Sequence, residues 1–274
     1  MEGAAARTTV GGSNAPLLLE ERADGVLRLT LNRPAQRNAL SIGLMTALGE
    51  ALDRAAADKE CRVVVIAGAG PAFCAGHDLR EFRTLDSDDR REAYQRIFAQ
   101  CGALMLQIVR LPKPVIAEVH GIATAAGCQL VATCDLAVAA ADARFATPGV
   151  DIGLFCSTPM VALTRAVGRK PAMEMLLTGE LIDAATAKAI GLVNRVVPRP
   201  QLAAATAALA QQIAAKSALT VAIGKEAFYR QAELGLAEAY GYAAEIMTKN
   251  MLTRDAAEGI DAFLEKRPPV WHDA

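Results

Sequence analysis

Short, fully apolar runs alternate along this chain with segments of helical periodicity. Val63–Ile66, Val115–Val119 and Leu136–Ala140 are such runs, and between residues 88 and 110 apolar side chains recur every three or four positions. Buried parallel strands are continuously apolar because helices cover both faces of their sheet. This alternation predicts an α/β fold, and 274 residues of which 53% are hydrophobic suffice for one large domain.

The start and the end of the chain have different local patterns. Asp24-Gly25 separates the apolar runs Leu17–Glu21 and Val26–Leu31, which predicts two paired strands joined by a tight turn. Residues 1–14 are expected to form a loose tail, and residues 15–200 the core that holds the site. Residues 201–274 are rich in alanine and leucine and are expected to form a helical region for subunit association.

Caps and breaks locate several helices. Ser41 is expected to cap a helix, Ser157 to begin one that ends at Gly168, and Asp183 and Gly191 to enclose another. Asp255 to Glu258 has the pattern of a capping pair that opens the last helix.

Composition excludes several classes of function. The net charge of −1 gives no basic excess for nucleic acid, so we expect no nucleic-acid partner. The longest uncharged run, Val119–Cys134, is too short to span a membrane, so we expect no membrane partner. The three histidines lack metal-ligand spacing, which predicts no metal site. Gly68-Ala-Gly70 follows a strand, but Pro71 and the missing third glycine exclude a dinucleotide fingerprint.

The six cysteines and the N-terminus bear on location. The cysteines lie singly in apolar surroundings, which is typical of reduced thiols. The chain begins without a basic segment followed by an apolar block, so no secretory signal is expected. We therefore expect a cytoplasmic, bacterial protein.

Two turns of small residues are the first candidates for a functional site. The turns lie in Ala72–Leu79 and Gly121–Gly127, and each is expected to follow an apolar strand and to enter a helix. Such turns can direct free backbone N–H groups into one cavity, where the helix dipole also favours negative charge. This arrangement suits the enolate of a thioester.

Several motifs spread over the chain resemble those of the enoyl-CoA hydratase/isomerase (crotonase) superfamily. The resemblance runs from Leu17 to Trp271 and is carried by Arg33–Leu40, Phe73–Leu79, His120–Asp135, Leu176–Gly179, Ala187–Val193 and Ala262–Arg267. It implies a ClpP/crotonase-like ββα spiral core with a C-terminal helical trimerisation region. It also implies an acyl-CoA or enoyl-CoA thioester as substrate, no cofactor beyond the coenzyme A of that substrate, and a homotrimer or dimer of trimers.

The resemblance assigns roles to residues of this chain. The backbone N–H groups of His77 and Ala126 would polarise the thioester carbonyl. Arg37 would lie near the CoA phosphates, Ala75 and Asp78 near the adenine, and Lys266 would reach CoA on a neighbouring subunit. The full set implied to bind substrate or CoA is Arg37, Ala39, Ala75, Gly76, Asp78, Leu79, Gly127, Phe263 and Lys266.

The two glutamates that a hydratase of this superfamily uses match Gln129 and Gly149 here. Neither residue can exchange a proton, and general acid–base catalysis usually contributes about 10²–10⁴ in rate. Efficient hydration by the usual route is therefore expected to fail. The remaining candidates for an ionisable group in the pocket are Asp151, Cys156, His77, His120 and Glu118.

Three functions stay open at this point. The chain is an acyl-CoA enzyme with weak or altered hydratase activity, a non-catalytic binder of CoA thioesters, or an acyl-CoA decarboxylase or isomerase that uses His77 or Asp151. Ala-Gly-His77-Asp resembles a decarboxylase of the same superfamily, although the tyrosine found there corresponds to Cys156. The His77 side chain either touches substrate or makes a structural hydrogen bond.

Overall fold

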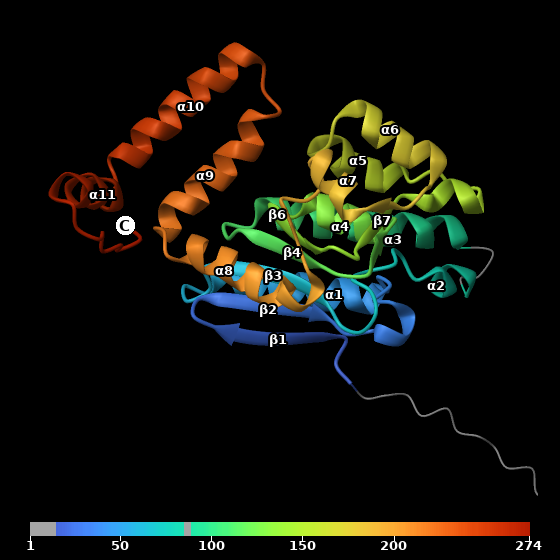
Figure 1. The fold of residues 1–274 in the computed structure, drawn as a ribbon. Coiled ribbons are helices and arrows are strands. Elements are labelled where there is room, and N and C mark those ends of the chain that lie inside the picture. The colour runs from blue at the N-terminus through green and yellow to red at the C-terminus, as the bar shows by residue number, and fades with distance from the viewer. Residues whose placement is uncertain (1–14, 85–88) are drawn as a thin grey trace, which may run out of the picture.

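The computed structural model describes residues 15–84 and 89–274, so the expected tail over residues 1–14 lies outside the described residues. A six-stranded sheet runs through the molecule (Figure 1), and its first two strands form the predicted antiparallel hairpin, while all other neighbours are parallel. In spatial order the strands are β1 (Leu18–Ala23), β2 (Val26–Leu31), β3 (Val63–Gly68), β4 (Val115–Val119), β6 (Leu136–Ala140) and β9 (Arg195–Val197).

A second, three-stranded sheet lies beside the first. It consists of β5 (Ile122–Thr124), β7 (Arg144–Ala146) and β8 (Ile182–Asp183). These strands are only two or three residues long, so they have no periodicity that sequence reasoning could detect, and all three were missed. β5 lies within the run Gly121–Gly127 that was predicted as a turn.

Two layers of helices cover the large sheet because side chains alternate between its faces. Val64 and Ile66 of β3 join one apolar cluster, and Val63 and Val65 join another against α8. α8 therefore packs with the core, although sequence analysis assigned it to the C-terminal region. The helices of this part are α1 (Ile42–Ala57), α2 (Leu79–Arg83), α3 (Arg90–Arg110), α4 (Ala126–Thr133), α5 (Ser157–Ala166), α6 (Arg169–Thr178), α7 (Ala184–Ala189) and α8 (Leu202–Ala214), with short 3₁₀ helices η1 (Pro34–Gln36), η2 (Pro148–Ile152) and η3 (Arg199–Gln201).

Two of the predicted caps are confirmed. The Ser41 side chain accepts the Leu44 N–H at the start of α1, and Asp183 accepts the Thr186 N–H at the start of α7. The helix predicted from Ser157 ends at Ala166, before Gly168, and α6 follows it.

Three helices extend away from the core, and we call residues 218–265 the arm (Figure 1). They are α9 (Ala218–Gln231), α10 (Leu236–Met251) and α11 (Arg254–Glu265). Neither α9 nor α10 contains a buried residue, while Phe228, Tyr240 and Met247 are exposed. Packing within the described chain therefore covers little of the arm's apolar surface.

A buried ion pair joins the arm to the core. The Lys225 Nζ of α9 lies 2.6 Å from the Asp135 carboxylate and also donates to the carbonyls of Ile108 and Lys113. Tyr229 donates to the same carboxylate over 2.8 Å, and the Val115 N–H does so over 2.7 Å. Asp135 thus has a structural role: its carboxylate accepts a backbone N–H near its own turn and also binds two side chains of the arm.

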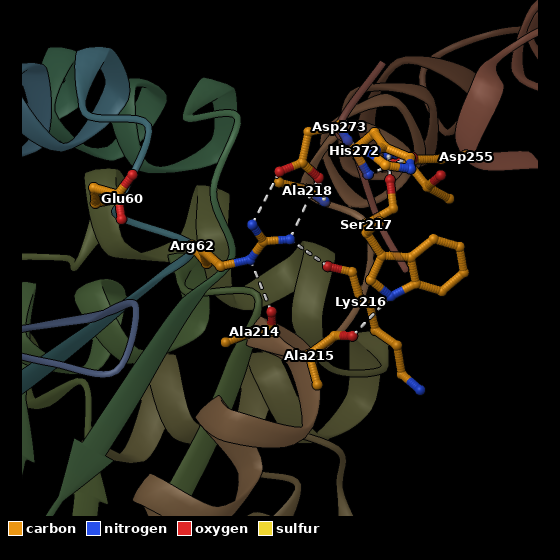
Figure 2. A network of polar contacts seen from close by, with 12 residues as sticks. Glu60, Arg62, Ala214, Ala215, Lys216, Ser217, Ala218, Asp255, His272 and Asp273 are labelled. Atoms are coloured by element: carbon orange, nitrogen blue, oxygen red, sulfur yellow. Dashed lines mark hydrogen bonds and ion pairs between the residues drawn. The ribbon is translucent and has the colours of Figure 1, made fainter. Parts of the chain in front are cut away.

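A second set of polar contacts fixes the hinge between α8 and α9 (Figure 2). Arg62 donates to the carbonyls of Ala214 and Lys216 and pairs with Asp273 over 3.0 Å. The Asp273 carboxylate also accepts the Ala218 N–H over 2.6 Å. The C-terminal residues therefore clasp the hinge, and we call this set the clasp.

Asp255 belongs to the same network and corrects a prediction. Its carboxylate accepts the backbone N–H groups of His272 and Asp273 over 2.7 and 3.0 Å. The predicted capping pair is wrong, because Thr253 caps α11 by accepting the Ala256 N–H. The Asp255 carboxylate instead binds the backbone of His272 and Asp273, where the C-terminal residues return to α11.

No helix among residues 15–84 and 89–274 has both the length and the apolar character to cross a bilayer.

Candidate functional site

The two predicted turns run side by side in the structure. The Phe73 N–H donates to the His120 carbonyl over 3.0 Å, and the Cys74 N–H to the Ile122 carbonyl over 3.1 Å. The Thr124 N–H then donates to the Cys74 carbonyl over 3.0 Å. These bonds hold residues 73–77 against the entry to α4.

The amides assigned to the carbonyl lie at the end of this pairing. A Cβ added to Gly76 would lie 3.4 Å from the Ala126 nitrogen and 2.9 Å from the Ala125 Cβ, so the turn before His77 lies against the first residue of α4. Within the described residues, the N–H groups of His77 and Ala126 donate to no acceptor. An N–H in the first turn of a helix has no intrahelical partner, so it can bind a ligand.

Glycine is required at two points of this approach. A Cβ on Gly121 would lie 2.1 Å from the Pro71 carbonyl oxygen, and one on Gly127 would lie 2.1 Å from the Cys74 carbonyl oxygen. Both distances are far below van der Waals contact, so a larger residue would push the two segments apart.

The segment 37–40 lies on the other side of residues 75–78. The Ala75 N–H donates to the Arg37 carbonyl over 3.0 Å, and the Leu40 N–H donates to the Gly76 carbonyl over 2.7 Å. The structure therefore brings Arg37, Ala39, Ala75 and Gly76 together, as well as Gly127 through Cys74.

Sequence reasoning missed two residues that hold this loop, although both lie in the quoted Arg33–Leu40 motif. The Asn38 amide accepts the Arg33 N–H over 2.8 Å and donates to the carbonyls of Ala69 and Ala72. The Arg33 guanidinium lies 2.7 Å from the Asp78 carboxylate. Burial raises the pKa of Asp78, but Arg33 and the Arg80 N–H outweigh it, and the pKa is lowered. The Asp78 side chain is thus held as a partner of Arg33 and a cap of α2.

Gln129 is buried on the first full turn of α4. The residue is 4% exposed, and its Oε1 accepts the Cys101 thiol of α3 over 3.9 Å. Its Nε2 donates to no acceptor in the part of the chain that the structure describes. One end of this amide is therefore free to bind something else.

Gly149 has no room for a side chain. A Cβ there would lie 2.6 Å from the Leu154 carbonyl oxygen and 2.9 Å from the Cys156 Sγ. The Leu154 N–H donates back to the Gly149 carbonyl over 2.9 Å, which folds this loop onto η2. Burial raises the pKa of the Cys156 thiol, so Cys156 is a neutral thiol at pH 7.

Three of the other candidate groups have partners or positions elsewhere. Glu118 pairs with Arg28 across the sheet, and the His120 Nε2 lies 2.9 Å from the Gly70 carbonyl oxygen. Asp151 is exposed, and its carboxylate oxygens lie 3.1 and 3.2 Å from where a Cβ of Gly179 would be. The structure does not present these three as buried pocket groups.

The His77 ring packs among aromatic side chains. Its centroid lies 5.7 Å from that of Phe82 and 5.8 Å from that of Phe98. Both ring nitrogens are enclosed and have no hydrogen-bond partner of good geometry among the described residues, and only a looser contact with the Leu40 backbone acts to raise the pKa of the ring. Burial lowers the pKa of His77, which keeps the imidazole neutral at pH 7.

Three predicted residues stand apart from the turns. Leu79 is the exposed first residue of α2, next to the site. Phe263, which is 82% exposed, and Lys266 lie at the end of α11, which Figure 1 shows far from α4. The described chain does not bring these two residues to the turns.

The six cysteines are free and buried. Across residues 15–84 and 89–274, histidine, cysteine and acidic side chains form no group of three that could hold a metal ion.

A family model described as enoyl-CoA hydratase/isomerase matches residues 21–274. The enoyl-CoA hydratase domain-containing protein 3 of Xenopus laevis is 46% identical, over 94% of this chain and 87% of its own length. The human protein of that name is 46% identical over 90% of this chain and 81% of its length. A putative enoyl-CoA hydratase of Thermus thermophilus is 38% identical over 87% of this chain and 94% of its own length.

These relatives correct one expectation. The five proteins named enoyl-CoA hydratase domain-containing protein 3 are 45–46% identical and are all named as mitochondrial proteins of animals. This finding contradicts the expected bacterial, cytoplasmic location.

Solved structures agree in fold. An enoyl-CoA hydratase of Mycobacterium smegmatis has a TM-score of 0.91 at 56% identity, covering 94% of this chain and all of that one. The human enoyl coenzyme A hydratase domain-containing protein 3 has a TM-score of 0.89 at 44% identity, covering 93% of this chain and all of that one. By fold and by sequence, the chain belongs to the enoyl-CoA hydratase/isomerase family, with the crotonase fold that its motifs predict.

Proposed function

We propose that this protein binds an acyl-CoA thioester with its carbonyl oxygen between the backbone N–H groups of His77 and Ala126, and that it stabilises the enolate. The observation that carries the proposal is the pairing of the two turns, which sets Gly76 against Ala126 and leaves both amides without an acceptor in the described chain. One donor of this kind is typically worth about 10²–10³ in rate.

Hydration is the reaction that this site supports least. Gln129 cannot act as a base, and Gly149 cannot be replaced by an acid without moving the loop that carries Leu154 and Cys156. We therefore propose weak or altered hydratase activity, with enolate chemistry that does not depend on two carboxylates.

The test uses a substitution that fills the site from the backbone side. Gly76→Ala would place a methyl group 3.4 Å from the Ala126 nitrogen, so butyryl-CoA binding measured by calorimetry should fall at least about tenfold. Gly191→Ala is the control, because Gly191 also has a positive φ, of 90°, but its Cβ would meet only the Ala166 carbonyl at 3.5 Å. Equal affinity in both variants, or no affinity of the wild type for any acyl-CoA, would contradict the proposal.

A second candidate is non-catalytic binding of CoA thioesters. It is favoured by the absence of a proton-exchanging group at Gln129 and Gly149. Turnover separates the two candidates, because tight binding of crotonyl-CoA without any product, in protein that is folded, supports binding alone.

We also propose that copies associate as a homotrimer or a dimer of trimers. The support is the arm, whose two long helices contain no fully buried residue within the described chain. In such an assembly Phe263 and Lys266 would meet the CoA of a neighbouring subunit.

A further inference from the structure

A pocket of about 110 Å³ lies where the core, the hinge and the start of α9 meet. Residues of α1 and of the segments before β3 and β4 form its core side, and residues of α8, the hinge and α9 form the other. One water molecule takes about 30 Å³ of the liquid, so the pocket admits a group of several heavy atoms. The charged residues that line it are all positive, namely Arg62, Lys113 and Lys216.

The pocket lies at the opposite end of the large sheet from the two turns. Arg62 immediately precedes β3 and Lys113 precedes β4, whereas the turns follow the ends of these strands. β3 and β4 are parallel neighbours, so their starts share one end of the sheet and their ends the other. β3 has six residues and is therefore about 20 Å long. The pocket is thus separate from the place proposed for the thioester carbonyl.

Two of the three positive charges have no carboxylate partner in the part of the chain that the structure describes. Arg62 pairs with Asp273, but neither lysine forms an ion pair there. Lys113 uses one of its three N–H groups, on the Asp58 carbonyl over 3.0 Å. The ammonium group of Lys216 donates to none of the residues drawn around it (Figure 2). The lining therefore combines two uncompensated positive charges with free donors.

Groups of the pocket already bind one anion of the chain. The Asp273 carboxylate lies between the Arg62 guanidinium and the Ala218 N–H at the start of α9 (Figure 2). Arg62 and Ala218 line the pocket, while Asp273 does not. Four of the five N–H groups of Arg62 have acceptors, which leaves one for a ligand. A positive charge beside a helix N-terminus favours a further anion.

We propose that the pocket binds the phosphate group of a small ligand, either the free ion or a small phosphomonoester, and that this ligand joins the arm to the core. An ester phosphate carries about −1.5 to −2 charges at pH 7, which matches the two uncompensated lysines. A monocarboxylate would leave one of these charges unmatched. Arg62 and Lys113 belong to the core and Lys216 to the hinge, so an anion that contacts all three restrains the hinge.

Calorimetric titration of the full-length protein at constant ionic strength tests the site. Inorganic phosphate should bind at least about tenfold more tightly than acetate, because each hydrogen bond to a charged group contributes about 1.5–3 kcal/mol. Methyl phosphate separates the two sources, since tighter binding than that of inorganic phosphate assigns the site to phosphomonoesters and weaker binding assigns it to the free ion. Phosphate affinity no greater than that of acetate would overturn the inference.

Variants assign the binding to the pocket. Lys113→Met and Lys216→Met should each weaken phosphate binding at least about tenfold and leave butyryl-CoA affinity unchanged. Lys249→Met is the control, because Lys249 pairs with Glu245 in α10 and does not line the pocket. Equal phosphate affinity in all three variants would overturn the inference. An equal loss of butyryl-CoA affinity in Lys113→Met and Lys216→Met would also overturn it, since the pocket would then belong to the thioester site.

Hydrogen exchange tests the effect on the hinge. At ten times its Kd, phosphate should slow exchange in the first turn of α9 by up to about tenfold, while exchange in β4 stays unchanged. Binding without slower exchange at α9 would overturn the role that we assign to the ligand in joining the arm to the core.

Discussion

The glycines of the two site turns in the core and those of α9 and α10 in the arm lie in opposite surroundings. In the core, a Cβ on Gly121 or Gly127 would lie 2.1 Å from a backbone carbonyl oxygen. In the arm, a Cβ on Gly224 or Gly241 would meet nothing within 4 Å. The geometry of the candidate site is thus set by contact between main chains. At Gly224 and Gly241 the arm has no such contacts, and polar side chains such as Lys225 and Asp273 join it to the core.

The apolar side chains show the same contrast. Two buried clusters fill both faces of the large sheet, whereas α9 and α10 bury no residue. Apolar surface that a chain leaves open on this scale is typical of a protein interface. The core is therefore stable through its own packing, and the arm depends on its anchors and on the proposed neighbouring copies.

The largest expected effect comes from reversing the glycine contrast. Gly127→Ala should destabilise the protein by at least about 3 kcal/mol and abolish acyl-CoA binding, because the Cys74 carbonyl must move to admit the methyl group. Gly241→Ala is the matched change in α10, where alanine is the better helix former by about 1 kcal/mol, so stability should hold or rise. Chemical denaturation measures both.

Similar losses in the two variants would contradict the contrast between core and arm. So would a Gly127→Ala variant that retains wild-type stability and binding.

Local patterns predicted much of the fold. The Asp24-Gly25 hairpin and the Ser41 cap are short-range features, because glycine accepts a positive φ and a serine reaches the N–H three residues later. The cap expected at Asp255 failed for a physical reason of longer range. That carboxylate is captured by His272 and Asp273, which return from the end of the chain.

The site was predictable only as far as its motifs extend. Spacing indicated two turns that belong together, and the structure pairs them. Spacing could not show that the Cys156 Sγ fills the place of a side chain at Gly149, nor that α3 contacts both His77 and Gln129. These relations arise between segments far apart in the sequence, where no local preference operates.

The second effect tests the buried anchor of the arm. Lys225→Met should lower the free energy of unfolding by roughly 2–3 kcal/mol, because the Lys225 side chain is only 7% exposed and its loss leaves the buried Asp135 carboxylate with only neutral donors. Lys249→Met removes the same charge from an exposed pair with Glu245 in α10, so the free energy of unfolding should change by less than about 0.5 kcal/mol. Thermal unfolding measures the difference. Equal shifts in unfolding temperature for the two variants would mean that the buried Lys225–Asp135 pair stabilises the protein no more than the exposed Lys249–Glu245 pair does.

The smallest effect concerns the clasp and its dependence on pH. Burial raises the pKa of Asp273, but the ion pair with Arg62 and the Ala218 N–H outweigh it, and the pKa is lowered. Burial likewise raises the pKa of Asp255, but hydrogen bonds from Ser217 and from the N–H groups of His272 and Asp273 outweigh it, so this pKa is also lowered. A carboxyl whose pKa is lowered in the folded state contributes stability above its unfolded pKa, about 4, and loses it as the pH falls further.

Hydrogen exchange at the Ala218 N–H should therefore speed up as the pH falls below about 4, after correction for the intrinsic rate, while exchange in β3 and β4 lags behind. Asp273→Asn should loosen the hinge already at pH 7, by about 1 kcal/mol or less since Asp273 is 37% exposed, and should flatten this pH dependence. Asp142→Asn is the control, because its pair with Arg199 is exposed and lies away from the hinge. If the arm and the core lose protection together in every variant, the clasp does not set the arm's direction independently, and the two regions form one cooperative unit.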